Sequence, residues 1–198
     1  SLKDLVFTSV FHSISAFCNA GFSLFSDSLT QFQFHFPTIL IISFLIIVGG
    51  LGFPVLFNLY QRFIKNPHTK LRLQTRMALV ITLSLILFGT FLIFCTEYSH
   101  SMSAFSFLEK LQLSYFQSVT TRTAGFVTTD ITMFHPSTIM MCLILMIIGA
   151  SPVSTGGGIK TTTFALILIS FWNIVKSSFR FDYQKKTIDP NSVFVAFA

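Results

Sequence analysis

Two short glycine-containing runs hold the residues in this sequence that are best suited to chemistry. They are Cys18-Asn19-Ala20-Gly21 and Arg122-Thr123-Ala124-Gly125. A shift of 104 positions superimposes the two glycines, and each of them is preceded by alanine and followed by phenylalanine. The two runs therefore form an internal repeat.

The chemistry that such runs can perform is the coordination of a cation by backbone carbonyls. Glycine adopts the positive φ that turns carbonyls toward one axis, and those carbonyls can replace the hydration shell of an ion. A closed ring of carbonyls needs about four such loops, so two loops predict half of a pore, or less, unless copies assemble. Because a cation in the run would repel the ions, we expect Arg122 to donate hydrogen bonds behind it or to pair with Asp130 or another acid.

The composition indicates that these runs lie in a membrane. Hydrophobic residues make up 52% of the sequence and charged residues 10%, against roughly 25% charged residues in a soluble domain. The mean hydropathy is +0.73. The first residues show neither an initiator methionine nor a secretory leader, so we expect the sequence to begin inside a longer chain.

The apolar segments predict an all-α integral membrane fold built from helix–pore-loop–helix repeats. Residues 5–17 and 108–120 are shorter than the roughly 20 residues of a membrane crossing, so each is expected to be a re-entrant half-helix that ends at a glycine run. Residues 37–64 and 77–95 are expected to span the membrane. The cluster Gly49-Gly50-Leu51-Gly52-Phe53-Pro54 predicts a kink or a close helix contact within the first span.

A third glycine-rich run, in residues 150–163, interrupts the last apolar segment and predicts one broken helix. Irregular backbone at membrane depth is tolerated only where protein or a water-filled cavity covers it. We expect Lys160 to bond loop carbonyls, to balance an acid, or to extend toward the cytoplasmic interface. A phosphate-binding loop is excluded because Ile159 separates Gly158 from Lys160, whereas that motif requires adjacent glycine and lysine.

The basic residues predict the orientation of the chain. Nine of the 13 Lys and Arg residues lie in two inferred inner segments, 62–76 and 176–186, which are cytoplasmic by the positive-inside rule. Anionic lipid or a partner could bind these segments, although ordinary membrane topology accounts for the same charge.

The sequence gives less support to three other functions: a metal site, an enzyme and a coupled transporter. The cysteines (Cys18, Cys95, Cys142) and the five histidines show no metal-ligand spacing, and no nucleophile–base pair of an enzyme is visible in a span. A proton- or sodium-coupled secondary transporter is the remaining alternative. It is expected to carry an intramembrane acid, whereas the acids here lie in stretches that indicate an interface or a position outside the core: Asp4, Asp27, Glu97, Glu109, Asp130, Asp182 and Asp189.

Taken together, residues 15–23, 120–126 and 152–163 resemble the Trk/Ktr/HKT superfamily of potassium and sodium transporters, and most closely the membrane subunits of bacterial Trk and Ktr systems. The resemblance implies a pore of four repeats. Residues 1–64 would hold the pore loop and second helix of repeat two, residues 65–180 the cytoplasmic loop and all of repeat three, and residues 181–198 a linker toward repeat four. The fourth-repeat arginine that the family places in the pore is absent from this sequence.

The resemblance also assigns roles to individual residues. It places K⁺, or Na⁺, at the filter residues Cys18, Asn19, Ala20, Gly21, Arg122, Thr123, Ala124 and Gly125. It assigns the gating loop to Ser154, Thr155, Gly156, Gly157, Gly158 and Lys160. Cys18 departs from the family, which usually has asparagine there, so a side-chain hydrogen bond behind the filter is put in doubt.

The partners are implied in the same way. We expect contact with membrane lipid, a homodimer, and a separate cytoplasmic ring of nucleotide-binding subunits, and no nucleic acid or cofactor. The expected location is the bacterial inner membrane, with several crossings.

Overall fold

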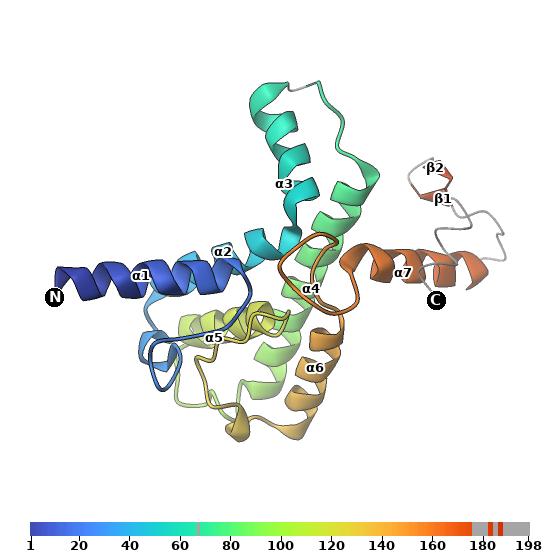
Figure 1. The fold of residues 1–198 in the computed structure, drawn as a ribbon. Helices are drawn as coiled ribbons and strands as arrows, with labels where there is room; N and C mark the ends of the chain where they lie inside the picture. Colours follow the sequence, from blue (N-terminus) through green and yellow to red (C-terminus); the bar gives the residue numbers. More distant parts are fainter. Residues whose placement is uncertain (67, 176–181, 184–185, 188–198) are drawn as a thin grey trace.

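The computed structural model describes residues 1–66, 68–175, 182–183 and 186–187. The regular elements of the described part are helices, apart from two strands of two residues each, and loops connect them (Figure 1). The α-helices are α1 (Leu2–Phe17), α2 (Phe36–Leu51), α3 (Phe53–Tyr60), α4 (Leu73–Glu97), α5 (Phe107–Thr120), α6 (Pro136–Ile147) and α7 (Thr161–Val175). The short elements are η1 (Thr30–Phe32), the π-helical η2 (Gln61–Lys65), η3 (Ile131–Met133), β1 (Asp182–Tyr183) and β2 (Lys186–Thr187).

Local sequence explains where the helices begin. Proline occupies the first turn of α2, α3 and α6, where its missing N–H costs no hydrogen bond. The two half-helices α1 and α5 each begin with a capping box, formed by Ser1 with Asp4 and by Ser106 with Glu109. The expected half-helices are therefore confirmed as discrete elements of 16 and 14 residues.

Helix α4 is the element on which the others assemble, and α2, α3, α5, α6 and α7 all contact it (Figure 1). It extends beyond the expected residues 77–95 and has 25 residues. Within the described residues it is the one unbroken helix long and apolar enough to cross a membrane. Gly89 allows the close packing of α5, since a Cβ there would lie 2.4 Å from the Ser118 hydroxyl oxygen.

The expected membrane span over residues 37–64 consists of two helices that meet at a large angle, rather than one kinked helix. Helices α2 and α3 are separated at Gly52 and meet at 99°. Gly52 has φ +80°, and a Cβ there would lie 2.7 Å from the Pro152 carbonyl oxygen. The bend therefore packs closely against the loop after α6, a partner that the local glycine and proline pattern does not reveal.

The expected break in the last apolar segment is confirmed. Helix α6 has 12 residues and α7 has 15, and a single parallel bridge between Ile148 and Ile159 closes the loop that separates them. Most of the expected linker, 181–198, and most of the basic segment 176–186 lie outside the described residues. The expected domain boundaries stay predictions.

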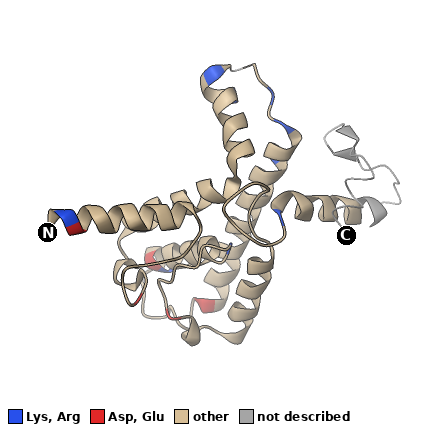
Figure 2. Cartoon of the chain, in the orientation of Figure 1, with Lys and Arg blue, Asp and Glu red and all other residues tan. Residues whose placement is uncertain are grey.

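Basic residues gather along the hairpin that leads from α3 into the beginning of α4, whereas the other end of α4 is acidic (Figure 2). Arg72 and Arg76 lie at its beginning, next to the basic hairpin of α3 and η2, while Glu97 is its last residue. This distribution agrees with the orientation expected from the basic residues.

Glu97 is the last residue of α4, and its side chain is fully buried by the surrounding protein. Its carboxylate accepts the Ser101 hydroxyl at 2.7 Å, the His135 N–H at 2.9 Å and the Thr138 hydroxyl. It thereby joins the end of α4 to the beginning of α6, where a negative charge is favoured by the helix dipole.

We expect Glu97→Ala to lower the free energy of unfolding by about 3 kcal/mol, since three donors, of which the Thr138 hydroxyl is buried, lose a charged acceptor. Thermal unfolding in detergent measures the change. Glu109→Ala, which removes an exposed capping carboxylate, is the matched control and should cause a smaller loss. Equal losses in the two variants would contradict the structural role of Glu97.

Candidate functional site

The two glycine runs adopt the same backbone conformation. Asn19 and Gly21 have φ values of 51° and 70°, and Thr123 and Gly125 have values of 71° and 83°. The alanine between each pair is not among the positive-φ residues, so left-handed and ordinary residues alternate in both runs. This conformation requires glycine or a tolerant polar residue at the left-handed positions.

A hydroxyl at the end of each half-helix braces the run that follows. The Ser15 hydroxyl donates to the Phe22 carbonyl at 2.8 Å, and the Thr120 hydroxyl donates to the Phe126 carbonyl at 2.7 Å. Sequence analysis missed this pair because the repeat shift of 104 aligns Ser15 with Val119 rather than Thr120. A search for hydroxyls within one residue of the repeat position would have found it.

The structure brings the two runs into contact. A Cβ on Gly21 would lie 2.4 Å from the Ala124 carbonyl oxygen and 3.0 Å from the Gly125 Cα. Beyond the runs, the Leu29 N–H donates to the Val127 carbonyl at 2.9 Å. The two runs therefore meet at Gly21, Ala124 and Gly125. Among the eight expected filter residues, Cys18, Ala20 and Gly125 are exposed and Asn19, Arg122 and Ala124 are buried.

Arg122 donates hydrogen bonds to Thr82 on helix α4, which is the first of the two roles expected for it. Its guanidinium lies 3.3 Å from the Thr82 carbonyl oxygen and 3.4 Å from the Thr82 hydroxyl oxygen. The other expectation, a pair with Asp130, is wrong. The Thr132 hydroxyl and N–H bond the Asp130 carboxylate instead and hold its pKa below the ordinary value.

The loop between α6 and α7 packs directly against the filter runs. A Cβ on Gly156 would lie 2.7 Å from the Thr123 hydroxyl oxygen, 2.4 Å from the Ala150 Cβ and 3.5 Å from the Asn19 amide nitrogen. Only glycine fits between these groups. The position of the loop explains why its sequence is small and polar.

Hydrogen bonds within this loop fix its shape. The Ala150 N–H donates to the Gly157 carbonyl at 3.1 Å, and the Ile159 N–H donates to the Ile147 carbonyl at 2.9 Å. The Lys160 ammonium donates to the Gly156 carbonyl at 2.8 Å, which is the first of the three roles expected for it. The Ser154 hydroxyl donates to the Ser151 carbonyl, and Gly157 is open, with no atom within 4 Å of a Cβ.

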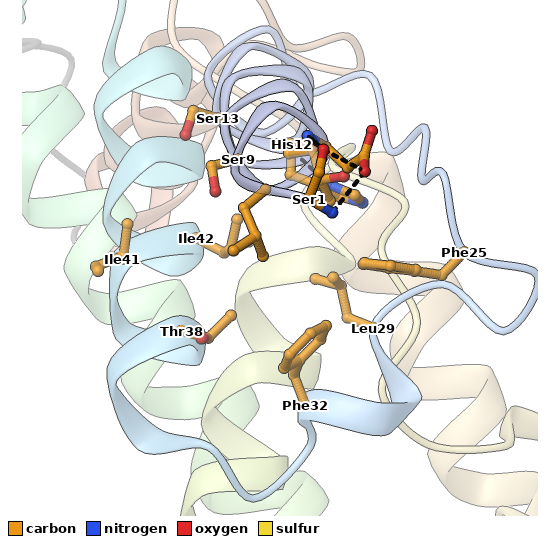
Figure 3. A pocket seen from close by; sticks show the side chains of 13 residues that line it. Ser1, Ser9, His12, Ser13, Phe25, Leu29, Phe32, Thr38, Ile41 and Ile42 are labelled. Atoms are coloured by element: carbon orange, nitrogen blue, oxygen red, sulfur yellow. Dashed lines mark hydrogen bonds and ion pairs between the residues drawn. The ribbon is translucent and has the colours of Figure 1, made fainter.

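A cavity of about 680 Å³ lies along α1, between that helix, α2 and the residues around η1 (Figure 3). His12 is one of its lining residues and bonds the Thr8 carbonyl and the Ser23 hydroxyl. None of the expected filter or gating residues lines it. In the part of the chain that the structure describes, no three His, Cys, Asp or Glu residues are placed to hold a metal ion.

The comparison with known families identifies this arrangement. The model of the TrkH cation transport protein family matches residues 3–194. The chain belongs to this family. Ktr system potassium uptake protein B of Bacillus subtilis is 45% identical over 169 residues, which cover 83% of the chain and 37% of that protein. The potassium/sodium uptake protein NtpJ of Enterococcus hirae is 36% identical over 96% of the chain and 42% of its own length.

The family fold agrees with a solved structure. The potassium transporter TrkH from Vibrio parahaemolyticus superimposes with a TM-score of 0.79 at 20% identity, over 96% of this chain and 41% of that one. The chain thus spans about two fifths of the length of the family members it matches.

Proposed function

We propose that this chain is part of the pore-forming subunit of a monovalent cation uptake system that conducts potassium. The observation that carries the proposal is the shared conformation of the two runs, with positive φ at Asn19 and Gly21 and again at Thr123 and Gly125. Ions would pass a filter of backbone carbonyls contributed by both runs. The relatives named for potassium uptake support K⁺ as the transported ion.

The loop of residues 154–160 is proposed to gate the pore. It lies against Asn19 and Thr123 in both filter runs, so a movement of this loop changes what lies next to the filter. In this proposal the chain holds repeat three and part of repeat two, the subunit forms a homodimer in the bacterial inner membrane, and a separate nucleotide-binding ring acts on the loop from the cytoplasm.

The alternative is a transporter coupled to protons or sodium, which needs an acid that exchanges ions inside the membrane. Glu97 is buried, but its carboxylate is occupied by Ser101, His135 and Thr138 at the beginning of α6. This arrangement favours a structural role for Glu97.

Uptake of radioactive rubidium and sodium into proteoliposomes that contain the full-length protein tests the proposal. We expect rubidium uptake without an imposed proton gradient, and we expect Gly125→Ser to alter it, since serine is strained at φ +83°. Uptake that needs a proton gradient and is unchanged in Gly125→Ser would favour the coupled transporter. An absence of uptake of either ion would contradict both.

A further inference from the structure

Three segments meet at the side chain of Thr155 in the loop between α6 and α7. Its hydroxyl donates to the Phe17 carbonyl at 3.0 Å and accepts the side-chain amide of Asn19 at 3.0 Å. Its N–H lies 3.4 Å from the Gly49 carbonyl oxygen. One residue therefore connects the end of α1, the first filter run and helix α2.

The junction is close because α2 carries glycine at this point. A Cβ on Gly49 would lie 1.9 Å from the Phe17 carbonyl oxygen and 3.1 Å from the Thr155 hydroxyl oxygen. Phe17 is the last residue of α1, so its carbonyl has no partner in the next turn of the helix. The Thr155 hydroxyl takes the place of that partner.

The two filter runs are not held by the loop in the same way. Asn19 and Thr123 occupy equivalent positions of the repeat and both have positive φ. The Asn19 amide bonds Thr155, whereas the Thr123 hydroxyl is buried among described atoms without a hydrogen-bond partner. In the described residues the loop is thus bonded to the first run and only packed against the second.

We infer that Thr155 is a positioning residue that holds the intramembrane loop against the first filter run, so that release of its hydroxyl frees the loop. The inference rests on the proposed function, because it concerns the gate of that pore. The loop then has two positions, and the hydrogen bonds of Thr155 favour the one in this structure. Removing a contact that exists in one of two states shifts the population toward the other.

The test is rubidium uptake by the full-length protein in proteoliposomes, compared among wild type and three variants. Thr155→Val and Thr155→Ala remove the hydroxyl, with and without a branched side chain. Each is expected to raise the uptake rate by about fivefold or more, since about fivefold is the effect of one neutral hydrogen bond and the hydroxyl makes two. Thr155→Ser keeps the hydroxyl and is expected to restore uptake to within about twofold of wild type. Size-exclusion chromatography shows which variants are folded. If Thr155→Val does not fold, the comparison is made with Thr155→Ala.

Each result has a distinct meaning. Wild-type uptake with unchanged or reduced rates in both hydroxyl-free variants overturns the role of Thr155 and leaves the proposed pore standing. A Ser variant that behaves like the Val variant also overturns it, because the hydroxyl would then not be the group that matters. Absence of rubidium uptake in wild type contradicts the proposed function itself, and the role of Thr155 falls with it.

Discussion

Gly21→Ala is expected to reduce rubidium uptake by about tenfold or more. Two physical effects act at this position. The residue has φ +70°, where a side chain costs roughly 1–2 kcal/mol. In addition, the new Cβ would lie 2.4 Å from the Ala124 carbonyl oxygen, so the second filter run must move. In the proposed filter, a carbonyl that is displaced in this way would no longer face the ion, and proteoliposome uptake measures the loss.

Two further alanine variants serve as comparisons for Gly21→Ala. Gly125 has the same positive φ, but its Cβ would meet only the Gly21 Cα, at an ordinary 3.5 Å, so Gly125→Ala should reduce uptake less. Gly50 lies nearby in α2, where a Cβ would be 3.5 Å from the Asn19 amide nitrogen, and Gly50→Ala should transport like wild type. Equal uptake by all three variants would show that the contact between the two runs does not shape the filter.

The features that could be predicted from the sequence are those that depend on neighbouring residues. The repeated alanine, glycine and phenylalanine predicted two equivalent runs. Both have positive φ at the same two positions, because glycine and small polar residues set that conformation locally. The broken helix was predicted for the same reason, since a glycine-rich stretch between two short apolar segments cannot continue a helix.

The features that could not be predicted depend on residues far away in the chain. The amide of Asn19 bonds Thr155, which is 136 positions away, and Arg122 bonds Thr82, which is 40 positions away. Burial of Glu97 depends on His135 and Thr138. The sharp bend at Gly52 packs against the carbonyls of Pro152 and Val153. A single sequence shows the polar group in each of these pairs but not its partner.

The loop between α6 and α7 is expected to be the second place where one methyl group has a large effect. A Cβ on Gly149 would lie 1.9 Å from the Gly157 carbonyl oxygen and 2.9 Å from the Gly158 Cα. The two sides of the loop would have to separate, which breaks the bonds from Gly149 to Ile159 and from Ala150 to Gly157. We expect Gly149→Ala to lower the free energy of unfolding by about 3 kcal/mol, from the lost bonds and the steric overlap.

Gly157→Ala is the matched control for this prediction, because it adds the same methyl group to the other side of the same loop. No atom lies within 4 Å of its Cβ, so the free energy of unfolding should stay within about 0.5 kcal/mol of wild type. Thermal unfolding of both variants in detergent measures the difference. If the two variants unfold at the same temperature, the loop can accept a side chain at Gly149. The contact between the two sides of the loop would then not be what holds the loop next to the two runs. If only Gly149→Ala is destabilised, the shape of the loop depends on that backbone contact, and its position next to Asn19 and Thr123 depends on it as well.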